Sequence, residues 1–209
     1  MNTAIRQQWL DLRQRLAKLV VETDASFSIR VPGGRSMLLG RVLEGEPETF
    51  DWHTPAGDDA QAITHAAVYR TRPDVGAILM GGGTFGFCLA SFGGQLPVLF
   101  DEQARHLGHM GPPAGHERDL PQTLQAGGNS LLIRGIPVCL GTTSARMALN
   151  AELFEKCAKA YTLASATGKR ISLLPWLIDF VANGRLLKDE KRAAKAYASG
   201  QLPEEIRGY

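Results

Sequence analysis

A short apolar run held between two helical segments constrains the fold of this chain more than any other feature. Residues 61–70 have the pattern of a helix, which stops before an arginine–proline pair, and residues 75–80 form a run suited to a buried strand. Three glycines, Gly81–Gly83, interrupt the run, and residues 84–92 resume as a compact helix. Strands that alternate with helices in this way predict a layered α/β domain.

The same alternation runs through the rest of the 209 residues. An amphipathic helix is predicted at 3–22, where apolar residues recur at helical spacing. Further strands are predicted at 26–31, 36–43 and 49–52, and extended runs at 97–100, 129–134 and 137–140. Further helices are predicted at 101–107, 143–167, 173–182 and 187–198. Residues 108–128 hold several Gly and Pro and form the least regular segment. We expect one main domain over 1–168 and a C-terminal helical extension of that domain over 169–209.

Composition excludes several classes of protein. Lys and Arg number 23 against 21 Asp and Glu, which gives a net charge of +2, too balanced for a general polyanion binder. Three cysteines are too few for a disulfide scaffold, and their apolar neighbours predict buried free thiols. The N-terminus lacks the apolar region of a secretory leader, and the apolar stretch at 173–182 is too short to cross a bilayer. We therefore expect a cytoplasmic protein whose partner is neither a nucleic acid nor a membrane.

Four segments follow one another in an order that a known family shares. The run HAAVYRTRPDVGAIL at 65–79 places a histidine and a tyrosine on a helix before an R-P-D-V turn and a strand. ASFSIR at 25–30 precedes it, and LLIRGIPVCLG at 131–141 and a helix at 148–161 follow it. Taken along the chain, the segments at 25–30, 65–79, 131–141 and 148–161 resemble four parts of the class II aldolase/adducin family. These parts are its G-N-x-S-x-R strand, its central signature, its later strand and its closing helix.

The resemblance covers roughly residues 5–165 and implies a fold. It implies a three-layer α-β-α arrangement in which a central, largely antiparallel sheet carries helices on both faces. Members of the family commonly assemble as four-fold tetramers with active sites between subunits. A homotetramer is therefore the assembly that the resemblance implies for this chain.

The residues that hold the metal in the family are missing here. A class II aldolase stabilises an enediolate on a divalent metal, usually zinc, which is held by an H-x-H pair and a third histidine. In this chain the resemblance puts Met80 and Gly82 at the H-x-H positions and Gly135 at the third. A thioether is a poor zinc ligand, and glycine offers no side chain. The sequence therefore predicts that no metal cofactor is bound at this place.

The positions of the family's acid/base group and of its anion site have also changed. The acid/base carboxylate falls on Gln61, whose amide cannot take a proton near neutral pH. The glycine–asparagine pair that cradles a phosphate falls on Ala25 and Ser26. The joint change of ligand, base and anion site predicts that metal-dependent aldol cleavage is lost.

Candidate site residues remain, each with a plainer structural interpretation beside it. If the pocket of the family's active site remains in this chain without its metal, six residues are expected to bind a ligand there: Ser26, Ser28, Arg30, Gly81, Gly82 and Gly83. The weak catalytic candidates are His65, Arg30 and Asp101. The favoured interpretation of His65 is a buried core histidine, whereas an ordinary ion pair and a helix-capping aspartate explain Arg30 and Asp101 equally well. A relocated metal site would use His106, His109 and His116, which are otherwise interpreted as surface or interface histidines.

The leading hypothesis is a class II aldolase/adducin-like protein that has lost its metal centre. It would act as an oligomeric binding or scaffold subunit, pairing with itself or with an active paralogue, and would bind a small anionic metabolite in the remnant pocket. The alternative is a lyase, either an aldolase or a decarboxylase, with relocated catalytic residues. Its substrate would be a small hydroxy- or keto-acid or a sugar phosphate, and zinc or another divalent metal would then be its cofactor.

Overall fold

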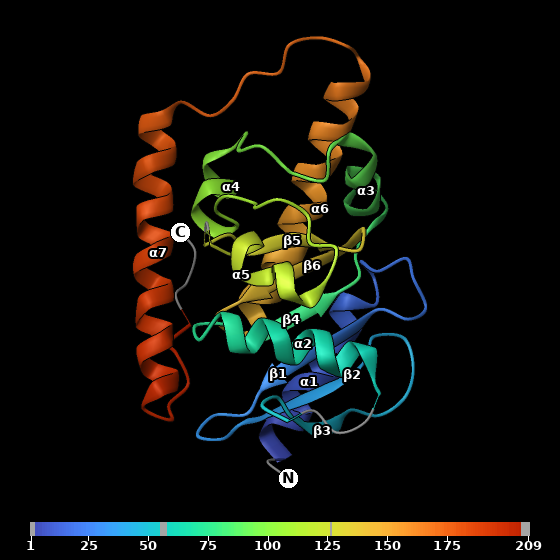
Figure 1. Cartoon of the computed structure of the whole chain (residues 1–209), viewed down its shortest axis with the longest axis vertical. Coiled ribbons are helices and arrows are strands. Elements are labelled where there is room, and N and C mark those ends of the chain that lie inside the picture. Colours follow the sequence, from blue (N-terminus) through green and yellow to red (C-terminus); the bar gives the residue numbers. More distant parts are fainter. Residues whose placement is uncertain (1–2, 55–57, 126, 206–209) are drawn as a thin grey trace.

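The chain is described by a computed structural model that covers residues 3–54, 58–125 and 127–205. Its described strands form one six-stranded sheet in the order β3-β2-β1-β4-β6-β5, and every neighbouring pair is antiparallel (Figure 1). The strands are β1 (Ser26–Arg30), β2 (Ser36–Arg41), β3 (Glu48–Asp51), β4 (Ala77–Met80), β5 (Ser130–Ile133) and β6 (Ile136–Gly141). The central, antiparallel sheet predicted from the resemblance is confirmed.

Helices cover both faces of this sheet. They are α1 (Thr3–Leu16), α2 (Ala60–Thr71), α3 (Thr84–Cys88), α4 (Asp101–His106), α5 (Leu120–Thr123), α6 (Ser144–Ala166) and α7 (Trp176–Ala198), with 3-10 turns η1 (Leu89–Phe92) and η2 (Glu117–Asp119). The helices α1 and α6 pack on one face, and α2 with α5 packs on the other (Figure 1). The three-layer α-β-α fold is therefore confirmed.

Alternation along the strands divides the core into two layers. Phe27 and Leu79 point into the layer beneath α1 and α6, whereas Ile78 and Met80 point into the layer beneath α2. Phe27 is fully buried and stacks on Trp9 of α1, with ring centroids 4.3 Å apart. Burying a large apolar side chain contributes about 1.5–3 kcal/mol, so each layer stabilises the sheet substantially.

Two predicted elements differ in the structure from their expected form. The helix predicted at 3–22 ends at Leu16, because the chain then turns and the Val21 N–H donates to the carbonyl of Gly82 at 3.0 Å. The extended run expected at 97–100 does not join the sheet, since these residues pair with none of the described strands. The side chain of Gln103 instead binds the Leu99 N–H at 3.0 Å and the Pro97 carbonyl at 2.9 Å.

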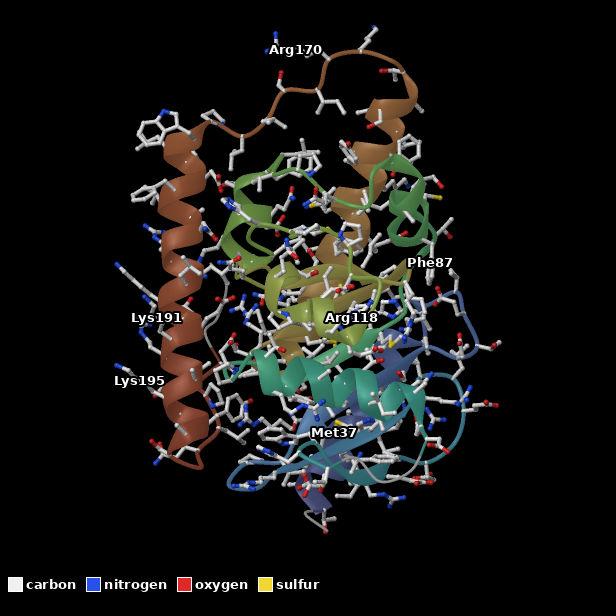
Figure 2. All side chains as sticks on the ribbon, viewed as in Figure 1. Met37, Phe87, Arg118, Arg170, Lys191 and Lys195 are labelled. Carbon is white, nitrogen blue, oxygen red and sulfur yellow. The ribbon has the colours of Figure 1, made fainter. Side chains whose placement is uncertain are left out.

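The C-terminal part holds one long helix instead of the two predicted pieces. Gly184 lies between the helices predicted at 173–182 and 187–198, and in the structure it is part of α7 and does not break it. A glycine costs a helix only about 1 kcal/mol relative to alanine, and the burial of Leu186 against the body of the protein outweighs that. The helix runs beside α4 along one edge of the molecule (Figure 1), and Lys191 and Lys195 point away from that edge (Figure 2).

The apolar segments and the cysteines match their predictions in part. Within the described residues, no helix combines the length and the apolar character needed to span a bilayer. All three cysteines are free: Cys139 and Cys157 are buried and Cys88 is half-buried. Burial raises the pKa of the Cys157 thiol to about 12, so it stays protonated and inert at neutral pH.

Candidate functional site

A small cavity lies at the end of β4, where the resemblance places the metal site. Its volume is about 160 Å³. It is lined by Glu22, Asp24, Ala25, Gln61, Met80, Gly81, Phe87 and Ile136. Phe87, labelled in Figure 2, comes from α3, and Met80 is the last residue of β4. The cavity thus brings the predicted metal and acid/base positions Met80 and Gln61 to one place, and we call it the remnant cavity.

The residues around the remnant cavity do not fit a divalent metal. Met80 contributes a thioether, and a Cβ added at Gly82 would lie 3.2 Å from the Cβ of Pro137, which leaves little room for a longer side chain. Gly135 sits in the β5–β6 turn with φ +80°, a conformation that disfavours a histidine. The amide of Gln61 is engaged, since it donates to the Asp24 carbonyl at 2.6 Å. Across residues 3–54, 58–125 and 127–205, no group of three His, Cys, Asp or Glu is arranged to hold a metal ion.

Glu22 introduces a carboxylate that the sequence analysis missed. Its Oε2 accepts the Gly82 N–H at 3.3 Å, and its Oε1 is buried with no hydrogen-bond partner among the described residues. Burial is the main cause that raises the pKa of Glu22. The only signal in the sequence was a short acidic stretch before the first strand, which is typical of many surface loops.

The glycine turn at Gly81–Gly83 is bound within the protein. The Gly81 N–H donates to the Pro137 carbonyl at 2.8 Å, and Gly82 donates to Glu22. After the turn, the Glu155 carboxylate of α6 accepts the N–H groups of Phe85 and Gly86, each at 2.8 Å. A Cβ at Gly83 would overlap this carboxylate, so the glycine there makes room for a cap on α3.

Ser26, Ser28 and His65, which the sequence offered as ligand-binding or catalytic residues, form a closed polar cluster inside the core. Ser26 Oγ lies 3.1 Å from His65 Nε2, and Ser28 Oγ lies 2.8 Å from Nδ1. Ser28 Oγ is also 3.0 Å from the hydroxyl of Tyr69, and all four residues are at most 1% exposed. Burial lowers the pKa of His65 to about 3, so the ring is neutral. The cluster joins β1 to α2.

Arg30 and Asp101 lie apart from each other and from the remnant cavity's lining. The Arg30 guanidinium lies between two rings, 5.1 Å from the centroid of Trp52 and 4.5 Å from that of Tyr197, and donates to the Pro73 carbonyl at 2.8 Å. Burial lowers the pKa of Arg30. Asp101 is the exposed first residue of α4, where its carboxylate accepts the following backbone N–H.

The three histidines of the alternative metal site point to different partners. The side chain of His106 contacts Arg146, with Nδ1 2.8 Å from Nη1. His109 Nε2 lies 2.9 Å from a carboxylate oxygen of Asp179 on α7. His116 stands at the start of η2. The structure therefore does not bring these histidines together around one position.

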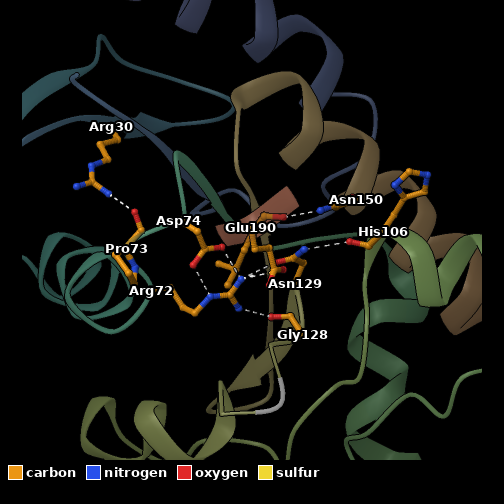
Figure 3. A network of polar contacts seen from close by, with 10 residues as sticks. Arg30, Arg72, Pro73, Asp74, His106, Gly128, Asn129, Asn150 and Glu190 are labelled. Atoms are coloured by element: carbon orange, nitrogen blue, oxygen red, sulfur yellow. Dashed lines mark hydrogen bonds and ion pairs between the residues drawn. The ribbon is translucent and has the colours of Figure 1, made fainter. Parts of the chain in front are cut away.

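The R-P-D-V turn organises a buried charge network (Figure 3). The Arg72 guanidinium donates two bonds to Asp74, at 2.8 and 2.7 Å, and one to the Gly128 carbonyl at 2.9 Å. It also donates to Asn129 Oδ1 at 3.1 Å and lies 3.0 Å from Glu190 of α7. The network ties the turn to the start of β5 and to the C-terminal helix, which gives the motif a structural role.

Comparison with known proteins identifies the fold. No protein-family model matches the sequence, and no curated protein matches it. An L-fuculose 1-phosphate aldolase superposes with a TM-score of 0.74 over 90% of this chain and 98% of that chain, at 17% identity. The chain has the class II aldolase fold.

Two further structures share the class II aldolase fold with this chain. YgbL from Escherichia coli, provisionally described as an aldolase/epimerase/decarboxylase, gives a TM-score of 0.71 at 16% identity, covering 86% of this chain and 98% of that chain. An aldolase II superfamily protein from Pseudomonas syringae gives 0.63 at 13% identity, covering 90% and 87%. At these identities the likeness concerns the fold.

Proposed function

We propose that this protein uses the class II aldolase fold as an oligomeric binding or scaffold subunit without metal-dependent aldol cleavage. The observation that carries the proposal is the lining of the remnant cavity. At the positions where the family's chemistry requires imidazole donors and a carboxylate base, the cavity is lined by the thioether of Met80 and the engaged amide of Gln61, and the neighbouring Gly82 offers no side chain. The unpaired cysteines accord with the cytoplasmic location that we include in the proposal.

The charge beside the remnant cavity supports loss of the family's phosphate-bearing substrates. A shallow groove shares Asp24 and Gln61 with the cavity. Its remaining charged lining consists of Arg41, Glu44, Glu46, Glu48 and Asp59. Carboxylates thus outnumber the single arginine, and their field disfavours a doubly charged phosphate group there. A small anionic metabolite, if it is the ligand of this protein, is better placed elsewhere.

We expect the purified, untagged protein to contain less than 0.1 equivalent of zinc, manganese or iron, on the order of background, because thioether and glycine are poor donors. Metal content after dialysis against each ion checks this. L-Fuculose 1-phosphate and short hydroxy- and keto-acids are then offered with each metal, and no cleavage above the buffer rate is expected. Stoichiometric metal together with turnover would contradict the proposal.

A second candidate function rests on Glu22. A carboxyl group with a raised pKa at the wall of a small cavity is suited to general acid/base chemistry. The alternative is therefore a carbon–carbon lyase that acts on a small hydroxy- or keto-acid, in line with the provisional description of YgbL. The assay above distinguishes the two candidates. This candidate is favoured if the unmodified chain shows turnover, Glu22→Gln loses it, and Asp24→Asn, a matched change on the same wall of the cavity, keeps it.

The start of α7 supports self-association. Six large apolar side chains between residues 173 and 181 are exposed: Leu173, Trp176, Leu177, Ile178, Phe180 and Val181. Trp176 is 76% exposed and Phe180 70%. These two rings alone present roughly 300 Å² of apolar surface, and a patch of this kind on a monomer commonly marks an interface. We propose a second copy of this chain as the partner, in a homotetramer, with an active paralogue as the alternative occupant.

The double variant Trp176→Ser/Phe180→Ser is expected to shift the protein from an oligomer to a smaller species, because it removes most of the aromatic surface available for burial. Light scattering coupled to gel filtration measures the mass. The variant Leu163→Ser removes an apolar side chain of similar exposure, 52%, on α6, and should keep the oligomer. A monomeric unmodified chain, or an oligomer unchanged by the double variant, would contradict this assignment.

A further inference from the structure

A second cavity lies at the opposite end of the sheet from the remnant cavity. Its volume is about 290 Å³, and it opens where β6 ends and α6 begins, between α4 and α7. Met80 pairs with Val138 near the start of β6, whereas this cavity follows Gly141 at its end. The two cavities are therefore separate, and a ligand site in the second does not presuppose any activity at the remnant cavity.

One buried side chain that lines this cavity has a hydrogen-bond donor without a partner among the described residues. His106 lines it and is 4% exposed. A guanidinium can only donate hydrogen bonds, so His106 Nδ1 accepts from Arg146 and the neutral ring carries its proton on Nε2. Burial, with the charges of Arg146 and Arg105, lowers the pKa of His106 to about 4 and keeps the ring neutral. No hydrogen bond to Nε2 occurs among the described residues.

Positive charge converges on the same cavity. Arg15, Arg105 and Arg146 line it, and the charge of Arg105 helps to lower the pKa of Arg146, second to burial. The first turn of the 23-residue helix α6 adds backbone N–H groups, of which one is capped by Thr143 Oγ1 at 3.2 Å. Donors and cations together form the surroundings that an anion prefers.

The carboxylates that balance this charge come from other parts of the chain. Arg105 Nη2 lies 2.6 Å from Asp189 of α7, and Arg15 is paired with Glu152. Glu204 and Glu205, on the exposed segment after α7, also line the cavity, and the charge of Glu205 raises the pKa of Arg146. The tail therefore supplies a counter-charge from two exposed side chains, and interactions between exposed charges are weakened by screening.

We propose that this cavity is a binding site for a small phosphate-bearing anion, with the Glu204–Glu205 segment as its internal competitor. The ligand's oxygens accept from Arg146, from His106 Nε2–H and from the start of α6. Glu204 and Glu205 occupy the same positive field when the ligand is absent. A cavity of this size holds a group such as pyrophosphate together with a short carbon chain.

Titration calorimetry of the full chain with pyrophosphate, and with inorganic phosphate, tests the site. We expect binding that weakens with added salt. Arg146→Gln should weaken it tenfold or more, on the order of one charge-assisted hydrogen bond, whereas Arg146→Lys should keep most of it. Arg118→Gln removes the same charge from a side chain that is 80% exposed, and should leave binding unchanged. The unfolding temperature of each unliganded variant shows that it is folded.

The competitor is tested by Glu204→Gln/Glu205→Gln. This variant should bind pyrophosphate about threefold to tenfold more tightly than the unmodified chain, since two repelling charges are removed. If Arg146→Gln and Arg118→Gln weaken pyrophosphate binding equally, the proposed site is wrong, because the effect then comes from net charge and not from this cavity. The absence of binding in both the unmodified chain and the Glu204→Gln/Glu205→Gln variant would overturn it as well.

Discussion

Replacing Arg72 by methionine is expected to lower the free energy of unfolding by about 3–5 kcal/mol. Methionine keeps the length of the stem but leaves Asp74 and Glu190 buried without their cation. It also leaves the carbonyl of Gly128 without its donor. Removing one partner of a buried charge network costs far more than the intact network contributes, because the remaining charges must stay out of water. Chemical denaturation measured by circular dichroism gives the free energy of unfolding.

The matched control for this variant is Arg118→Met, which removes the same charge from the surface. It should change the free energy of unfolding by less than about 0.5 kcal/mol. A loss below about 1 kcal/mol in Arg72→Met would contradict the structural role assigned to the R-P-D-V turn. Because Glu190 belongs to α7, the variant should also loosen that helix, which faster amide exchange in 176–198 would report.

The stability of the protein is expected to fall between pH 5 and pH 8 because of Glu190. Burial raises the pKa of this carboxyl from its ordinary value of 4.5 to about 7, although Arg72 acts in the opposite direction. The folded protein therefore holds this proton more tightly than the unfolded chain does. The contribution of the group to stability is complete below pH 4.5 and is lost as the pH rises through 7. The loss amounts to about 2–3 kcal/mol.

The variant Glu190→Gln removes this titration while keeping the shape of the side chain. The quantity to follow is the free energy of unfolding of the variant minus that of the unmodified protein. This difference should rise by about 2–3 kcal/mol from pH 5 to pH 8. Denaturation curves across this range measure the difference, and Glu44→Gln, at a carboxylate that is 70% exposed, should show no such trend. A pH-independent difference for Glu190→Gln would mean that Glu190 titrates normally in the folded protein.

Local patterns in the sequence were sufficient for most of the fold. Alternation in 26–31 predicts the strand that forms as β1, and the helix expected at 61–70 forms as α2 with Asp59 as its N-cap. These elements depend on neighbours within a few positions, so their signal is contained in short windows. The order of four motif-bearing segments predicted the class II aldolase fold, which the solved structures confirm. The residues at the positions where the resemblance expects metal-binding histidines, Met80, Gly82 and Gly135, are likewise given directly by the sequence.

Contacts between distant segments decided the rest. Glu190 and Arg72 meet only when α7 docks beside the sheet, and nothing near either residue in the sequence indicates the other. Glu22 reaches the remnant cavity, and Glu205 the cavity at α6, for the same reason. The pKa shifts of Glu190 and Glu22 follow from burial and from charges that folding brings near, and a linear chain has neither. Periodicity therefore predicts a helix or a strand in advance, whereas the chemistry of a side chain is set by the neighbours that packing gives it.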